Sequence, residues 1–116
     1  MAIETENDVI VAVRRAIAIH LSQGHPTIHH VARTVGINAR TLQRRLARHR
    51  RTYRQLVDEV RLEIACSLLK AQDKSIGQIA VELGYSDPAH FTRAFGRMTG
   101  VTPRGYQMGT RDRAAG

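Results

Sequence analysis

Apolar residues recur at helical spacing along most of this chain, with polar residues filling the intervals. Val9, Val13, Ile17 and Leu21 lie four residues apart, which predicts one amphipathic helix near the start. A longer stripe predicts a helix of about 18 residues, and its members are Tyr53, Leu56, Val57, Val60, Ile64, Leu68 and Leu69. The β-branched and aromatic runs that strands require are absent from the sequence. The pattern therefore predicts an all-α fold.

Two shorter segments repeat one pattern of hydroxyl, apolar, small and turn residues. Seven positions match at an offset of 48, pairing Thr27, Ile28, Val31, Ala32, Val35, Gly36 and Ile37 with Ser75, Ile76, Ile79, Ala80, Leu83, Gly84 and Tyr85. Beyond each turn the match resumes at an offset of 49, pairing Leu42, Arg44 and Leu46 with Phe91, Arg93 and Phe95. A capped helix, a small residue at the crossing and a glycine turn are typical of a helix-turn-helix. The sequence predicts two of them.

Capping and turn residues divide the chain into about seven expected helices. Hydroxyl, amide and acidic residues favour the position before a helix, while glycine and proline favour its ends. The expected helices run from a cap at Thr5 or Asn7 to Gly24 and Pro26, from Thr27 to about Thr34 with Gly36 in the turn, from Asn38 to His49, from about Tyr53 to Lys70, from Ser75 to the turn at Gly84, from Pro88 to Gly100, and from Thr102 and Pro103 to a short last turn at Tyr106.

This distribution of capping and turn residues predicts two lobes on either side of a connecting helix. We expect an N-terminal helix-turn-helix lobe at 1–51, a linker helix at 52–71, a C-terminal lobe at 72–108 and a disordered tail at 109–116. Each lobe resembles the three-helix unit of homeodomains.

The charge of the chain points to a polyanionic partner. Its formal net charge is +8, its pI is near 11.0, and no Asp or Glu occurs between Val9 and Val57. The same stretch holds ten arginines, which are Arg14, Arg15, Arg33, Arg40, Arg44, Arg45, Arg48, Arg50, Arg51 and Arg54. Arginine forks match phosphate oxygens and guanine edges in a bidentate manner. Two helix-turn-helix motifs with this charge predict binding to double-stranded DNA.

The second helix of each motif is expected to lie in the major groove. Taking Leu42, Leu46, Phe91 and Phe95 as buried anchors and rotating about 100° per residue identifies the outward face. The predicted base-contacting residues are Arg40, Gln43, Arg44, Ala89, His90, Thr92 and Arg93. The predicted phosphate-contacting residues are Thr27, Arg48, Arg50, Arg51, Arg54, Ser75 and Arg97. Arg44 and Arg93 suit guanine, Gln43 suits adenine, and Thr92 suits a thymine methyl or a phosphate.

Other classes of function find less support. His25, His29 and His30 do not form a known zinc-ligand pattern. No nucleophile elbow or phosphate-cradling glycine loop occurs, and Cys66 is expected to pack inside a helix. We therefore expect no enzyme activity, no metal and no cofactor. A basic helical RNA-binding or protein-adaptor module is the alternative, although five Phe and Tyr residues and no Trp offer little base stacking.

The expected location is the bacterial cytoplasm, at the nucleoid. No apolar stretch approaches the roughly 20 residues that cross a bilayer, so no membrane partner is expected. The acidic, polar start is unlike a signal peptide. The single Cys66 cannot form an internal disulfide, which fits a reducing compartment.

From Thr27 to Tyr106 the chain resembles the DNA-binding domain of AraC/XylS-family transcriptional regulators. The specific part is Ser75-Ile76-x-x-Ile79-Ala80-x-x-Leu83-Gly84-Tyr85-Ser86-Asp87-Pro88-x-x-Phe91-x-Arg93-Ala94-Phe95, followed by Thr99-Gly100-Val101-Thr102-Pro103-x-x-Tyr106. The looser pieces are Leu42-Gln43-Arg44-x-Leu46 in the first motif and Arg61-x-x-x-Ala65 in the linker.

The resemblance covers about 80 of the 116 residues. It implies seven helices in two lobes and a monomer whose recognition helices enter successive major grooves. It also implies transcription regulation, with RNA polymerase as a candidate partner. Only about 26 residues precede the first motif, so we expect a stand-alone member or a C-terminal fragment, whose full-length parent could dimerise through an absent N-terminal domain.

Overall fold

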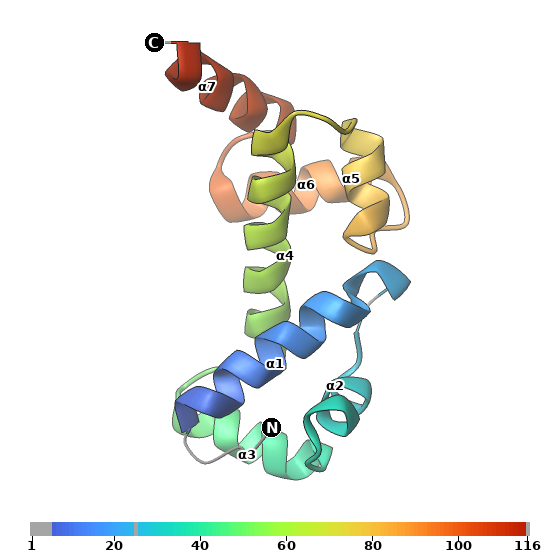
Figure 1. The fold of residues 1–116 in the computed structure, drawn as a ribbon, viewed down its shortest axis with the longest axis vertical. Coiled ribbons are helices and arrows are strands. Elements are labelled where there is room, and N and C mark those ends of the chain that lie inside the picture. Colours follow the sequence, from blue (N-terminus) through green and yellow to red (C-terminus); the bar gives the residue numbers. More distant parts are fainter. Residues whose placement is uncertain (1–5, 25, 116) are drawn as a thin grey trace. The chain divides into compact units, whose positions relative to one another are not determined.

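The computed structural model describes residues 6–24 and 26–115, with side chains at 8–24 and 26–109. Within these residues the fold is all-α, as predicted (Figure 1). Its elements are α1 (Glu6–His20), the 3₁₀ helix η1 (Leu21–Gln23), α2 (Ile28–Val35), α3 (Ala39–Arg48), α4 (Tyr53–Ala71), α5 (Ile76–Glu82), α6 (Pro88–Thr99) and α7 (Pro103–Ala115). The predicted caps Thr5 and Asn7, and His25 of the metal pattern, lie outside the described side chains.

The chain divides into two compact units, which we call unit 1 (up to Arg61) and unit 2 (from Leu62). The division falls inside α4, which the structure shows as one uninterrupted helix (Figure 1). Each unit has its own buried apolar residues. Those of unit 1 include Val9, Val13, Ile17, Leu21, Val31, Leu42, Leu46, Leu56 and Val57. Those of unit 2 include Ala65, Leu69, Ile79, Ala80, Leu83, Phe91 and Phe95.

Side-chain hydrogen bonds cap the N-termini of α2, α3 and α5 at the residues that the sequence predicts. The side chain of Thr27 accepts from His30 N at 3.3 Å, and that of Asn38 accepts from Thr41 N at 2.8 Å. Ser75 forms a capping box, because its side chain and that of Gln78 accept from each other's backbone N–H. These bonds satisfy donors that the first turn of a helix leaves without an intrahelical partner.

The last helix differs from the prediction of a short turn and a disordered tail at 109–116. The backbone is helical from Pro103 to Ala115. Thr102 supports its start, since its hydroxyl accepts from Gly105 N at 2.9 Å. From Gln107 to Ala115 the segment holds one Gln, one Met, two Arg and two Ala, which favour helix, against Gly109, Thr110 and Asp112, which do not. The helix-favouring residues are the majority, in keeping with a helix that continues past Gly109.

One half-buried phenol gives unit 1 a stability that depends on alkaline pH. Tyr53, at the start of α4, donates a hydrogen bond from its hydroxyl to the carbonyl oxygen of Pro26. Burial raises the pKa of Tyr53 to about 12, although the nearby charge of Arg61 acts in the opposite direction. The fold therefore favours the neutral phenol over the phenolate.

We expect unit 1 to lose stability as the pH rises from about 10, the pKa of an unfolded tyrosine, to about 12. The folded state holds the proton of Tyr53 in this window while the unfolded state releases it, so the free energy of unfolding falls. Tyr53→Phe should flatten this loss, and at neutral pH it should cost about 0.5–1.5 kcal/mol through the missing hydrogen bond. Urea unfolding at a series of pH values measures both effects. An equally steep alkaline loss in Tyr53→Phe would assign it to other groups.

Candidate nucleic-acid interface

The turn between α2 and α3 has the geometry of a helix-turn-helix. Gly36 has a φ of 90°, in the left-handed region that glycine adopts without strain. Its N–H donates to Ala32 O at 2.9 Å, and Ile37 N donates to the same oxygen at 3.1 Å. Ala32 is 2% exposed, so the crossing holds the small residue that close helix packing requires. In unit 1, α2 packs against both α1 and α3.

The turn between α5 and α6 repeats this arrangement in unit 2. Gly84 has a φ of 83°, and Tyr85 N donates to Ala80 O at 3.0 Å. This bond is the counterpart, 48 residues on, of the bond from Ile37 to Ala32. Asp87 starts α6, because its carboxylate accepts from His90 N at 2.7 Å. The repeat seen in the sequence is therefore a repeat of backbone hydrogen bonds.

Helix α3 places its predicted base-contacting residues on its solvent face. Leu42 and Leu46 are buried and anchor the helix within unit 1. Arg40, Gln43 and Arg44 are all exposed. The opposite face of α3 thus presents two guanidinium groups and one amide, which are the groups that read base edges in the major groove.

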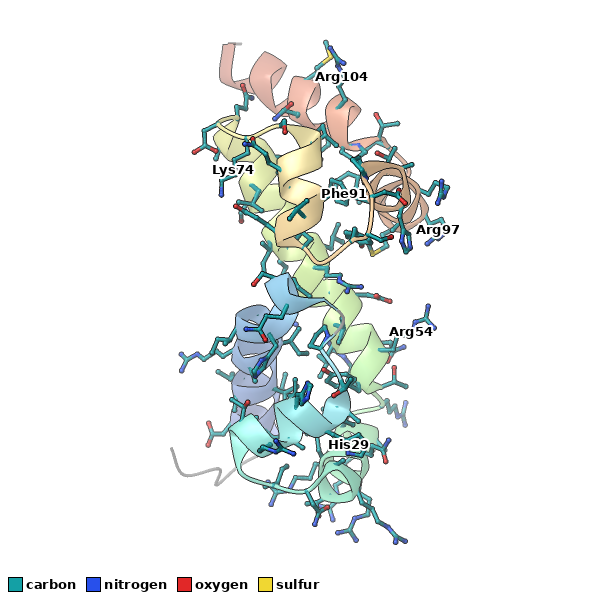
Figure 2. The ribbon with its side chains drawn as sticks, turned by 90° about the vertical axis from the view of Figure 1, so that its right-hand side faces the viewer. His29, Arg54, Lys74, Phe91, Arg97 and Arg104 are labelled. Carbon is teal, nitrogen blue, oxygen red and sulfur yellow. The ribbon has the colours of Figure 1, made fainter. Side chains whose placement is uncertain are left out.

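Helix α6 repeats this division in unit 2. Phe91 and Phe95 are buried, and Figure 2 shows Phe91 directed inward between α5 and α6. Among the predicted base-contacting residues, Ala89, His90 and Arg93 are exposed, whereas Thr92 is half-buried.

Aromatic packing fixes the start of α6. The ring of His90 lies edge-on to the ring of Tyr85, with centroids 5.2 Å apart. Tyr85 in turn contacts Phe91 at 5.4 Å. His90 is therefore tied to the buried cluster through Tyr85. Periodicity alone did not reveal this link.

The predicted phosphate-contacting arginines lie at the ends of the recognition helices and beyond them. Arg48, Arg50, Arg54 and Arg97 are exposed, and Figure 2 shows Arg54 and Arg97 extending away from the ribbon. Thr27 and Ser75 are exposed as well, and their side chains serve as helix caps.

Arg51 has an intramolecular partner that sequence reasoning missed. Its guanidinium forms an ion pair with the carboxylate of Glu59 on α4. Arg14 of α1 binds the same carboxylate oxygen at 3.0 Å. One carboxylate thus offsets part of the charge of two of the ten arginines in the acid-free stretch.

Unit 2 has a basic surface hollow of about 340 Å³, which the sequence analysis did not identify. It is lined by Lys74, Ser75, Ile76, Arg104, Gln107 and Met108. Lys74 donates a hydrogen bond to Glu82, and this bond together with the negative charge of Glu82 raises the pKa of Lys74. Arg104 was missed because α7 lies outside both copies of the repeated pattern.

The described part of the chain contains no group of three or more His, Cys, Asp or Glu side chains that could hold a metal ion. No helix there combines the length and apolar character needed to span a membrane.

Comparison with known families identifies the class of this fold. Residues 31–109 match the model of a family described as a helix-turn-helix domain. The chain belongs to this family, and its resemblance to AraC/XylS-type DNA-binding domains is confirmed.

Particular relatives agree with this assignment. The chain is 35% identical over 97 residues, 84% of its length and 28% of the relative's, to an uncharacterized HTH-type transcriptional regulator of Mycobacterium tuberculosis. The curated relatives that it matches are much longer, and it spans only 28% to 31% of the first three.

Solved structures share the fold. An AraC-type transcriptional regulator from Chromobacterium violaceum has a TM-score of 0.78 at 23% identity, over 90% of this chain and 93% of that one. The DNA-binding domain of AdpA, in complex with a target DNA, has a TM-score of 0.71 at 24% identity, over 90% of this chain and 94% of that one. At these identities the likeness establishes the fold.

Proposed function

We propose that this chain binds specific sequences of double-stranded DNA as the DNA-binding part of a bacterial transcription regulator. The observation that carries the proposal is the repeated build of α3 and α6. Each has a buried apolar edge under an exposed face that carries Arg44 or Arg93 at the same position of the repeat. Arginine at such a position suits guanine O6 and N7.

We further propose that one molecule places α3 and α6 in successive major grooves. The 19 residues of α4 give a helix about 28 Å long, of the order of the roughly 34 Å between groove centres one turn apart. The likeness to a domain crystallised with its target DNA supports a DNA partner. In this proposal the chain acts as a monomer in the cytoplasm, at the nucleoid, by binding without catalysis or cofactor.

Two further parts of the proposal concern protein partners of this chain and of any full-length parent. RNA polymerase is its proposed second partner, by analogy with the family. The relatives are more than three times as long as the matched segment; in any full-length parent we assign dimerisation to an N-terminal domain, while this chain binds as a monomer.

Selection of bound duplexes from a random pool, followed by competition, tests the proposal. We expect the selected duplex to compete about 10³-fold or more better than a random duplex at moderate salt. The matched competitors are the same sequence as single-stranded DNA, as double-stranded RNA, and an acidic peptide of equal charge. If one of these competes as well as the selected duplex, the chain is an RNA-binding or adaptor module instead.

A further inference from the structure

Gly96 lies within recognition helix α6 although the fold does not require a glycine there. The glycines with positive φ are Gly24, Gly36, Gly84 and Gly100, so Gly96 has ordinary helical geometry. A Cβ added to Gly96 would meet only the carbonyl oxygen of Val101, at 3.9 Å, which is ordinary van der Waals contact. Neither backbone conformation nor packing therefore excludes alanine at this position.

Glycine inside a helix is unfavourable, because it loses more backbone freedom on folding than alanine does. Unit 2 is thus less stable with Gly96 than it would be with alanine. Gly109 of α7 carries the same cost, but it lies outside both helices of the repeat. Gly96 instead stands next to the exposed Arg93 and Arg97 on α6, where a missing side chain leaves room for close approach of something outside the fold.

The other recognition helix has a small residue, although not a glycine, at the matching position. At the offset of 49 that relates the two helices, Ala47 of α3 is the counterpart of Gly96. Ala47 is exposed. It lies between Arg44 and Arg48, as Gly96 lies between Arg93 and Arg97. Gly96 itself is half-buried. Both helices thus carry a small residue with an arginine three positions before it and another one position after it.

We propose that Gly96 marks the point at which a DNA sugar–phosphate strand comes closest to α6, and that at Ala47 the strand lies farther from α3 by the size of one methyl group. This inference rests on the proposed function. With no side chain at position 96, the strand packs directly against the backbone of α6. Arg93 then reaches base edges on one side while Arg97 reaches a phosphate on the other. A methyl group at position 96 would hold the helix away from the strand and lengthen both contacts.

Gly96→Ala separates this role from a structural one, and Gly109→Ala is its matched control. Gly109 lies within α7, and a Cβ there would meet nothing within 4 Å. Both variants should raise the melting temperature by about 2–8 °C, since alanine stabilises a helix relative to glycine. Only Gly96→Ala should weaken binding to the selected duplex, by about tenfold or more, comparable to the loss of one good base contact. Ala47→Leu, at an exposed position, should weaken binding likewise without unfolding unit 1.

Melting curves measure the stability of each variant, and fluorescence anisotropy measures its affinity for the duplex selected by the wild type. Unchanged affinity in Gly96→Ala, with the wild type still preferring its duplex, would overturn the inference and leave the proposed function standing. A lower melting temperature in Gly96→Ala would show that the fold needs the glycine, and would overturn it too. A wild-type chain with no preference among duplexes would instead remove the proposed function, and this inference with it.

Discussion

Replacing Arg93 by alanine is expected to weaken binding to the selected duplex by about 1–3 kcal/mol and to relax the choice at one base pair. Arg93 is exposed on α6, and the buried Phe91 and Phe95 fix the helix on which it stands. Its removal leaves the core intact, so the loss should appear in binding and not in folding. Arg44→Ala should do the same from α3, at a different base pair. Anisotropy over a panel of single-base-pair variants of the duplex measures both.

A phosphate contact should behave differently, which makes Arg54→Ala the control. Arg54 is exposed near the start of α4 and belongs to neither α3 nor α6. Its removal should weaken all duplexes by a similar factor and reduce the salt slope of binding by about one. Arg93→Lys keeps the charge but loses the bidentate fork, so it should relax base choice while the salt slope stays. If the sequence profile survives both Arg93→Ala and Arg44→Ala, our assignment of the base contacts is wrong.

The parts of the fold that follow from neighbouring residues could be predicted from the sequence. The caps at Thr27, Asn38 and Ser75 each join atoms three residues apart. The left-handed turns at Gly36 and Gly84 depend on one residue each. Helix periodicity then separates buried from exposed positions within one helix. These are short-range properties, so a repeated pattern was enough to predict them.

The parts that depend on packing between elements could not be predicted in this way. Arg51 was grouped with the phosphate-contacting residues, but the structure pairs it with Glu59. That pairing requires the chain to turn back after α3, where Arg50 adopts a left-handed φ of 57°. Arg14 joins the same carboxylate from 45 positions away. Arg51→Ala thus tests DNA binding and the stability of unit 1 together, and Arg54 is the cleaner phosphate probe.

A second large effect is expected from a buried residue of α6, two positions after Arg93. Phe95→Ala is expected to destabilise unit 2 by about 3–5 kcal/mol, through lost burial and the cavity left behind. Phe95 is fully buried, and its ring meets those of Phe91 at 5.8 Å and Tyr106 at 5.7 Å. A small unit is marginally stable, so this loss is comparable to its whole stability. Phe95→Leu keeps most of the apolar volume, so its free energy of unfolding, measured in urea, should fall much less.

Because each unit has its own buried residues, the effect of Phe95→Ala should be confined to unit 2. In amide hydrogen exchange, α5 and α6 should lose protection while α2 and α3 of unit 1 keep theirs. The variant should then retain the weak, salt-sensitive DNA affinity of one recognition helix and lose the preference contributed by Arg93. Loss of protection in α2 and α3 as well would show that the two units fold as one cooperative body. Selective binding to duplexes would then require both cores to be intact at once.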